Sequence, residues 1–353
     1  MARVPIGVGL VGWGLAGRAL HAPFIKVTPE LELVAAVTSR EIDAAVFPST
    51  KRVDSLDDLL DIEGIDLVVI ATPNRLHVEQ SLRALACGKH VVCDKPLAET
   101  AAEVRTLMAA AAAADRLLVP YQNRRWDGDF RTLKALLASG QLGKVHYYES
   151  RWSKYQPVPR ERVAWKAEPR FGGPLYDLFP HLIDQAIVLF GRPSRVFARI
   201  DQNRPTGTVH DRAAVVLEYD DGPEVVLEVD LLDAFGGRKW QVRGLLGSFE
   251  KRGFDPQEAR LVAGELPNAA DWGREGAESY GMLRRATGPG EPVVTAAGDH
   301  RLFYHGIVDA IVHHAPPPVT LDDVLCQTEI IEAASRSNAT RQVVALGPPL
   351  PEK

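Results

Sequence analysis

A glycine-rich turn near the beginning of the chain constrains the fold more than any other stretch. Residues 6–19 read IGVGLVGWGLAGRA, so an apolar run is followed directly by the spacing G-x-G-x-x-G. Gly12 suits a tight turn, Gly14 lets the backbone approach a pyrophosphate, and Gly17 permits close packing of the next helix on the sheet. The start of that helix offers N–H groups to phosphates. Because a second apolar run follows at residues 31–37, this context favours a dinucleotide-binding βαβ unit over a glycine turn without a ligand.

Strands and helices alternate through the first third of the chain. Near-continuous apolar runs are typical of strands covered on both faces, and alternating βα units form a parallel, doubly wound sheet. The predicted strands are residues 6–11, 31–37, 67–71, 90–93 and 117–121. The predicted helices are residues 17–27, 56–60, 77–87 and 101–114.

The pattern changes near residue 122. A helix at 130–138, a strand at 145–152 and a helix ending near residue 190 are followed by strands without intervening helices, at 196–200, 213–219, 224–231, 240–244 and 247–251. Loops such as 220–222 and 245–247 suit antiparallel hairpins. We therefore expect a dinucleotide-binding domain over residues 1–122 and a second domain, of a different class, over 123–353.

The last part of the chain is expected to contain less regular structure. Residues 267–292 are rich in glycine, proline and polar side chains, which predicts a long loop. Two closing helices are expected at 303–313 and 321–337, the second with Thr320 as its N-cap.

Composition and charge exclude several classes of protein. The net charge of −5 argues against binding to nucleic acid or to an anionic membrane surface. The most apolar helical run, 107–114, is too short to span a bilayer. The three cysteines show no C-x-x-C spacing, which indicates a reducing compartment without disulfides or a zinc cluster. With no signal-type segment at the start, we expect a cytoplasmic protein.

The end of the second strand indicates which dinucleotide is bound. An acid at this position holds the ribose 2′-hydroxyl of NAD, whereas a 2′-phosphate needs hydroxyls and an arginine. The chain has Thr38, Ser39 and Arg40 here, and Glu41 comes later, in an expected helix. The absent acid and the forked guanidinium favour NADP over NAD, against the alternative that Arg40 only begins a solvated helix.

Residues at the ends of the next two strands are also candidates. Thr72, Pro73, Asn74 and the following His77 are expected to face the cofactor, because ligands of parallel sheets lie beyond the strand carboxyl ends. A plain strand-to-helix turn would explain Pro73 and Asn74 equally well.

Lys95 ends a buried strand, where desolvation favours a proton donor or alkoxide stabiliser. The alternative is a local ion pair with Asp94.

In the second domain, Asp177 and His181 are four residues apart, so one helix would place them on one face, with Pro180 in the first turn. A histidine paired with a carboxylate is a sound general acid or base. A purely structural pair is the alternative. Because no further ligands occur at recognisable spacing, no metal is expected.

Taken together, the segments G-W-G-L-A-G, A-T-P-N-R-L-H, D-K-P-L and L-Y-D-L-F-P-H-L-I-D-Q resemble the Gfo/Idh/MocA oxidoreductases across essentially the whole chain. The strings Y-Q-N-R-R-W-D at 121–127 and G-S-F-E-K-R-G-F-D-P-Q-E at 247–258 resemble a bacterial branch that includes an NADP-dependent scyllo-inositol dehydrogenase.

The resemblance implies an N-terminal Rossmann domain and a C-terminal α+β domain whose large, open, mainly antiparallel sheet forms a homodimer or homotetramer interface. It implies that Lys95 hydrogen-bonds the substrate oxygen, that His181 exchanges the proton, and that Asp177 contacts substrate hydroxyls. The implied cofactor contacts are Gly12, Trp13, Gly14, Leu15, Ala16, Thr38, Ser39, Arg40, Thr72, Pro73, Asn74, His77, Asp94, Lys95, Asn123, Trp165 and Lys166.

Three residues depart from the family pattern. Lys166 stands where relatives of this branch carry arginine, Asp94 replaces a more common glutamate, and Phe179 replaces a common glycine. The loss of a forked donor at Lys166 puts that contact in doubt.

The resulting hypothesis is an NADP-dependent oxidoreductase that transfers hydride between nicotinamide and a secondary alcohol or ketone of a sugar or cyclic polyol. Alternatives are an NADP-binding sensor without turnover, a nucleotide-linked keto-sugar reductase, and a glycosidase that uses NAD transiently. The intact Lys95, Asp177 and His181 favour the enzyme over the sensor, because a sensor needs no proton relay.

Overall fold

The computed structural model describes residues 5–158 and 172–347. They form two compact units. One contains the chain up to Trp126 together with Pro256–Gly273 and Asp299–Val324; the other contains Asp127–Asp255, Arg274–Gly298 and the chain from Leu325 onward. The chain thus passes between the units several times. Trp165 and Lys166 lie outside the described residues.

The first unit is built on a six-stranded parallel sheet with the strand order β3-β2-β1-β4-β5-β6. Its central strands are buried on both faces, as their continuous apolar sequences predict. The strands are β1 (Ile6–Val11), β2 (Leu31–Val37), β3 (Lys51–Val53), β4 (Leu67–Ile70), β5 (His90–Cys93) and β6 (Leu118–Pro120). The prediction of a doubly wound sheet is confirmed, and the short edge strand β3 is an addition to it.

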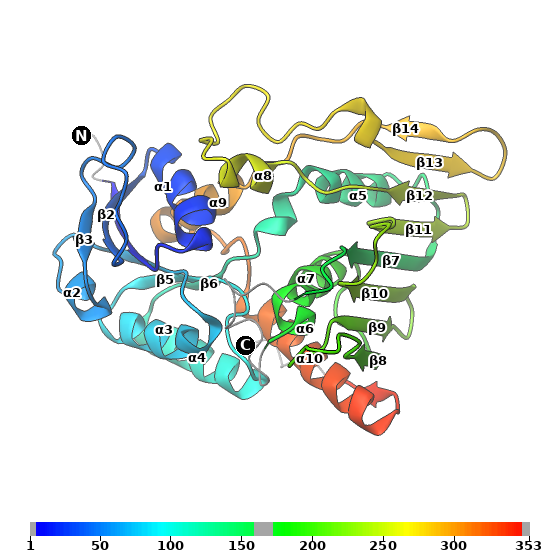
Figure 1. Cartoon of the computed structure of the whole chain (residues 1–353), viewed down its shortest axis with the longest axis horizontal. Helices are drawn as coiled ribbons and strands as arrows, with labels where there is room; N and C mark the ends of the chain where they lie inside the picture. The colour runs from blue at the N-terminus through cyan, green and yellow to red at the C-terminus, as the bar shows by residue number, and fades with distance from the viewer. Residues whose placement is uncertain (1–4, 159–171, 348–353) are drawn as a thin grey trace. The chain divides into compact units, whose positions relative to one another are not determined.

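Helices cover both faces of this sheet, with α3 and α4 on one side and α1 and α9 on the other (Figure 1). The helical segments are η1 (Ala16–His21), α1 (Ala22–Val27), α2 (Leu56–Leu60), η2 (Asn74–Leu76), α3 (His77–Ala86), α4 (Ala101–Ala114), η3 (Asn123–Trp126), α8 (Gln257–Val262) and α9 (Arg301–His313). Thr100 and Glu103 begin α4 with a capping box, in which each side chain accepts the backbone N–H of the other. Glu41 lies in a loop, not in the helix expected there, because residues 41–50 form turns.

The second unit contains a nine-stranded sheet with the order β14-β13-β12-β11-β7-β10-β9-β8-β15. All described pairs are antiparallel except that of β7 with β10. The strands are β7 (Val145–Ser153), β8 (Arg195–Asp201), β9 (Arg212–Glu218), β10 (Glu224–Asp230), β11 (Trp240–Gly244), β12 (Gly247–Lys251), β13 (Gly281–Arg285), β14 (Glu291–Val293) and β15 (Val344–Ala345). The long loop predicted for 267–292 is therefore wrong in part, because β13 and the start of β14 fall within it.

Helices pack on one face of the nine-stranded sheet, where alternate strand residues point inward to form the core (Figure 1). The helical segments are α5 (Gly128–Ala138), α6 (Pro174–Asp177), α7 (Phe179–Phe190), η5 (Ala277–Ser279) and α10 (Leu321–Thr340), which begins in the first unit. The Thr320 hydroxyl accepts the Asp323 N–H, as expected for the cap of α10. In the described part of the chain, no helix combines the length and apolar character needed to cross a bilayer.

Candidate active site

The glycine turn has the geometry that its spacing predicts. Gly12 adopts a φ of 101°, a left-handed conformation that favours glycine. A Cβ atom on Gly17 would collide with the Gly12 carbonyl, whereas a Cβ atom on Gly14 would meet no atom within 4 Å. The backbone at Gly14 thus borders open space, and the side chain of Leu15 is 49% exposed beside it. This shape fits a pyrophosphate approaching the main chain.

The carboxyl end of β2 carries the three residues that point to NADP. Ser39 and Arg40 are exposed, and the Thr38 hydroxyl accepts the Arg40 backbone N–H at 2.9 Å. That hydrogen bond shapes the turn and leaves the guanidinium of Arg40 at the surface. The residues present therefore fit a ribose 2′-phosphate.

The ends of β4, β5 and β6 bring further predicted residues to the same edge of the sheet. Thr72, Pro73 and Asn74 follow β4 and are half-buried. Asp94 and Lys95 follow β5, where the Asp94 carboxylate accepts the Lys95 backbone N–H at 2.8 Å. Because all six strands are parallel, these residues and the glycine turn share one edge.

Asn123, which begins η3 after β6, is 4% exposed. It also lies beyond the carboxyl end of its strand, as the cofactor hypothesis requires.

His77 lies differently from its neighbours in the motif. Its side chain is fully buried at the start of α3, and its Nδ1 and Nε2 atoms lie 2.8 Å from the carbonyl oxygens of Pro96 and Thr72. Its ring therefore contacts backbone on both sides.

Sequence reasoning missed a buried aromatic cluster directly behind the glycine turn. His21, in the π-helix η1, packs against Tyr121 with ring centroids 4.1 Å apart and planes tilted by 43°, and its Nδ1 lies 2.7 Å from the Tyr304 hydroxyl. Burial lowers the pKa of His21 to about 4, Asp94 opposes this effect and His77 adds to it. The ring is therefore neutral at physiological pH. Tyr304 comes from a distant segment, so no local motif could have revealed the cluster.

The second unit carries the other predicted catalytic residues. Asp177 ends α6 and His181 lies in the first turn of α7, with Leu178 between the helices. The expectation that one helix carries both is therefore wrong, because the chain restarts its helix at Phe179. Pro180 does lie in the first turn, and its carbonyl accepts a 2.6 Å hydrogen bond from the Gln327 side chain.

The imidazole of His181 stacks on the indole of Trp152, with ring centroids 5.4 Å apart and planes 29° from parallel. Trp152 lies on the inward face of β7, beside Tyr148 and Ser150 in the strand's alternation. This inward alternation is the one sequence signal that could have pointed to Trp152.

Behind Trp152 lies a buried charged group. The ammonium of Lys239 is 2.6 Å from Asp129 and 3.7 Å from Asp127, and it also lies 5.8 Å from the Trp152 ring. Burial raises the pKa of Asp129 to about 6, although Lys239 opposes the shift.

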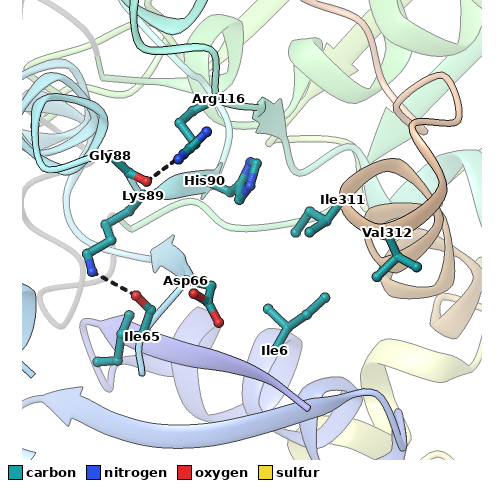
Figure 2. Close-up of a pocket in the computed structure, with 9 residues that line it drawn as sticks. All are labelled: Ile6, Ile65, Asp66, Gly88, Lys89, His90, Arg116, Ile311 and Val312. Atoms are coloured by element: carbon teal, nitrogen blue, oxygen red, sulfur yellow. Dashed lines mark hydrogen bonds between the residues drawn. The ribbon is translucent and has the colours of Figure 1, made fainter. Parts of the chain in front are cut away.

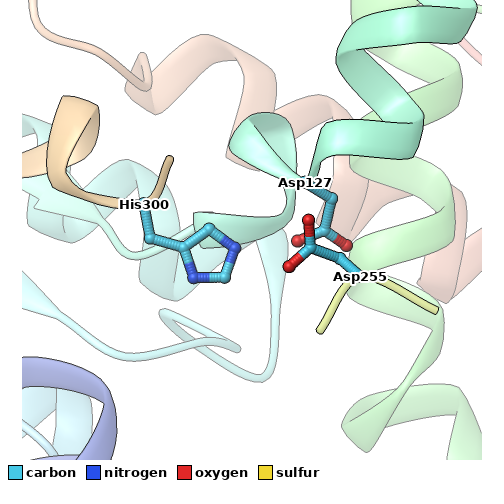
Figure 3. Close-up of side chains that lie close together, drawn as sticks. All are labelled: Asp127, Asp255 and His300. Carbon is cyan, nitrogen blue, oxygen red and sulfur yellow. The ribbon is translucent and has the colours of Figure 1, made fainter. Parts of the chain in front are cut away.

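Figure 3 shows Asp127 together with Asp255, whose carboxylate accepts the Gly128 N–H at 2.7 Å at the start of α5. His300, also drawn there, belongs to the first unit, where its N–H donates to Gln257. Asp255 thus holds the beginning of α5 within the second unit.

A separate pocket of about 290 Å³ lies at the opposite edge of the six-stranded sheet. Figure 2 shows Ile6, Asp66 and His90 at the amino ends of β1, β4 and β5, with Ile311 and Val312 of α9 across from them. Lys89 and Arg116 are tied to the carbonyls of Ile65 and Gly88. None of the predicted site residues lines this pocket, so it is separate from the candidate active site.

Two family models match the chain. An oxidoreductase family with an NAD-binding Rossmann fold matches residues 6–122, and the GFO/IDH/MocA C-terminal domain matches residues 130–250. The first match spans nearly all of the expected first domain, and the second spans about half of the expected second domain.

Relatives match over nearly the whole chain. The oxidoreductase YdgJ of Escherichia coli K12 is 38% identical over 97% of this chain and 99% of its own length. IolW of Bacillus subtilis 168, named as an NADP⁺-dependent scyllo-inositol 2-dehydrogenase, is 34% identical over 97% and 96%. The solved structure of the oxidoreductase yvaA from Bacillus subtilis superposes with a TM-score of 0.92 at 34% identity, covering 98% of this chain and 99% of its own.

Proposed function

Because the chain belongs to the GFO/IDH/MocA family of oxidoreductases, with an NAD-binding Rossmann fold, we propose that it interconverts a secondary alcohol and a ketone of a sugar or cyclic polyol with NADP(H). The observation that carries the proposal is the shared edge of the parallel sheet, where the glycine turn, Arg40 and Lys95 follow neighbouring strands. The printed activity of IolW supports an inositol-like substrate class.

The proposed coenzyme contacts follow from this edge. The backbone at Gly12, Gly14 and Ala16 binds the pyrophosphate, and Trp13 and Leu15 flank it. Thr38, Ser39 and Arg40 bind the ribose 2′-phosphate, and Thr72, Pro73, Asn74, Asp94 and Asn123 border the nicotinamide half. Bound NADP⁺ or NADPH supplies the hydride acceptor or donor. The proposed contacts of Trp165 and Lys166 fall outside the described residues.

In this proposal, three side chains stabilise the alkoxide, exchange the proton and orient the substrate. The Lys95 ammonium donates a hydrogen bond to the substrate oxygen and stabilises the alkoxide that develops as hydride leaves the carbon. His181 accepts the hydroxyl proton in oxidation and returns it in reduction. Asp177 accepts hydrogen bonds from neighbouring substrate hydroxyls and orients the ring.

A panel of inositols, aldoses and keto sugars, followed by NADPH absorbance, tests the activity. We expect turnover of at least one polyol, and a loss of ~10²–10⁴-fold in kcat for Lys95→Ala and for His181→Ala. Lys89→Ala and His146→Ala are matched controls, because Lys89 lies at the opposite edge of the sheet and His146 is exposed on β7. Near-normal turnover in either active-site variant contradicts the assigned roles.

Coenzyme preference has its own test. Ser39→Asp combined with Arg40→Ala replaces a phosphate-binding surface by a carboxylate, so we expect preference to shift from NADP to NAD. Comparison of kcat/KM for NADP with kcat/KM for NAD measures this preference. An unmodified protein that already uses NAD faster at equal concentration contradicts the proposal.

Three other outcomes would favour the alternatives. Tight NADP binding without turnover on any substrate indicates a sensor, and reduction of nucleotide-linked ketoses alone indicates a keto-sugar reductase. A co-purified coenzyme that cycles without net reduction indicates a glycosidase that uses NAD transiently.

We further expect a homodimer or homotetramer formed through the nine-stranded sheet. On the face away from the helices, Phe197, Val216 and Val226 form one apolar row across β8, β9 and β10, and Phe197 is 38% exposed. Ion pairs surround this row: Arg212 with Asp201 and Glu228, and Arg151 with Glu149 and Glu228. A face that carries both signs of charge can pair with a second copy across a two-fold axis.

Light scattering after size exclusion tests this assembly. Phe197→Glu is expected to reduce the molar mass toward that of the monomer, because it places a charge in the apolar row. Leu246→Glu, in the β11–β12 loop, is the matched control. An unchanged mass for Phe197→Glu rules out this face as the interface.

The expected compartment is the cytoplasm. Cys87, Cys93 and Cys326 form no disulfide in the described part of the chain, as is usual in a reducing environment.

A further inference from the structure

His77 connects two loops that carry residues of the proposed active site. Its Nε2 lies 2.8 Å from the carbonyl oxygen of Thr72, in the loop after β4. Its Nδ1 lies 2.8 Å from the carbonyl oxygen of Pro96, in the loop after β5 and next to Lys95. One ring thus spans the ends of two neighbouring strands.

Both partners of the ring are acceptors only. A carbonyl oxygen cannot donate, and a neutral imidazole carries a hydrogen on only one nitrogen, so its other nitrogen would present a lone pair to an oxygen at 2.8 Å. The two contacts are complete only when each nitrogen carries a hydrogen. Because the side chain is fully buried, water cannot substitute for the missing donor.

A carboxylate lies in the loop that the Nδ1 atom of this ring contacts. Asp94 lies in the same loop as Pro96 and holds the Lys95 backbone N–H at 2.8 Å. A charge-assisted hydrogen bond is about twice as strong as a neutral one, so a doubly protonated ring holds the two carbonyls firmly.

We propose that His77 is a positioning residue, protonated on both ring nitrogens, that ties the Thr72 carbonyl to the Pro96 carbonyl and so holds the Lys95 loop against the loop after β4. The assignment of Lys95 as the group that stabilises the alkoxide rests on the proposed function. The protonation state and the tie between the loops do not. His77 acts on the proposed coenzyme site through these two carbonyls.

The rest of α3 supports the same role. The Thr72 hydroxyl donates to the side chain of Gln80, one turn further along the helix, at 2.7 Å. The helix therefore holds the loop after β4 by a backbone and a side-chain contact. His77 adds a contact from the same helix to the loop after β5.

Nitrogen NMR of ¹⁵N-histidine-labelled full-length protein tests the protonation state without turnover. We expect both ring nitrogens of His77, assigned by comparison with His77→Gln, to give protonated-type signals at neutral pH. His90→Gln, at the opposite edge of the sheet, is the matched control and should leave these signals in place. A neutral tautomer for His77 overturns the inference.

Kinetics tests the positioning role. His77→Phe keeps an aromatic ring but removes both donors, so we expect kcat to fall about tenfold or more with a smaller change in the KM for NADPH. His77→Gln keeps one donor group and should recover part of kcat. Equal losses in both variants, or a lowered Tm with unchanged kcat, overturn the inference. If the wild-type protein turns over no substrate, the proposed function fails, and the NMR result still decides the state of His77.

Discussion

The indole of Trp152 constrains the orientation of His181 by stacking on its imidazole. The two rings are stacked, and the Phe254 ring meets the indole edge-on with centroids 5.4 Å apart. Aromatic pairs of this kind contribute about 0.5–1.5 kcal/mol beyond their buried area. Trp152→Leu should therefore lower kcat up to about tenfold, because the imidazole loses the surface that holds it.

The matched substitution for this prediction is Trp152→Phe, which retains a stacked ring and should retain most of kcat. Steady-state kinetics of both variants, with the KM for NADPH as a reference, checks the prediction. A similar loss of kcat in both variants would mean that volume, not stacking, is what His181 requires.

Single residues were predicted unevenly from the sequence. The positions of Lys95 and Arg40 at strand ends follow from the βα pattern, because a parallel sheet brings all such ends to one edge. His77 was expected to face the cofactor. Its contact with the Pro96 carbonyl joins two separate strand ends, so no residue spacing in the sequence predicts it. Trp152 and His181 are far apart in sequence, so their stacking follows only from the tertiary fold.

At the scale of an element, the glycine turn allows a paired prediction. An added Cβ atom would meet different surroundings at Gly14 and at Gly17. Gly14→Ala adds a methyl group where nothing lies within 4 Å, so the apoprotein should keep its Tm. The same methyl group would occupy the space proposed for the pyrophosphate, and the KM for NADPH should rise about tenfold, equivalent to about 1.4 kcal/mol.

Gly17→Ala provides the contrast. Its Cβ would collide with the Gly12 carbonyl, so the helix must move away from the strand and the Tm should fall markedly. Thermal melts of both apoproteins and NADPH titrations check the pair. A destabilised Gly14→Ala apoprotein would show that Gly14 serves the fold and not the coenzyme.

Elements with strong local signals were predicted well. The bounds of β1, β2, β5, α2 and α4 match their predicted ranges, because apolar runs, caps and alanine-rich periodicity are local features. β13 was missed because its pairing with β12 and β14, and not a local sequence signal, makes it a strand. β3 was missed because its three residues are half-exposed or exposed. The break between α6 and α7 falls at Leu178, which no local signal in the sequence marks.

At the scale of the whole molecule, both units contain a histidine that the fold keeps neutral. Burial lowers the pKa of His21 and of His210 to about 4, and the His210 Nε2 accepts the Leu175 N–H. The unfolded chain binds protons on these rings near pH 6.5, whereas the folded chain does not until about pH 4. Stability is therefore complete above pH 6.5 and is lost as the pH falls toward 4.

The size of this loss can be estimated. Each histidine contributes about 3 kcal/mol, and Asp129, whose raised pKa acts in the opposite direction, offsets about 3 kcal/mol. We expect the free energy of unfolding to fall by a net of about 3 kcal/mol between pH 7 and pH 4.5, measured by urea denaturation. His210→Gln should flatten part of this dependence, and an unchanged slope in this variant would show that His210 is not involved.

The division into units was the least predictable property of the whole chain. Segments Pro256–Gly273 and Asp299–Val324 belong with the first unit although the strands before them belong to the second. The sequence of α9 has the apolar periodicity of any amphipathic helix, and nothing in it indicates which sheet it covers.

The pocket at the amino ends of β1, β4 and β5 has a practical consequence for inhibitor discovery. A fragment lodged between Ile6, Ile311 and Val312 would raise the melting temperature as effectively as one bound at the catalytic edge. Ranking compounds by thermal shift alone would therefore not distinguish ligands of this pocket from inhibitors that bind at the coenzyme edge. Displacement of a fluorescent NADPH signal separates the two classes, because only compounds at the coenzyme edge can compete with it.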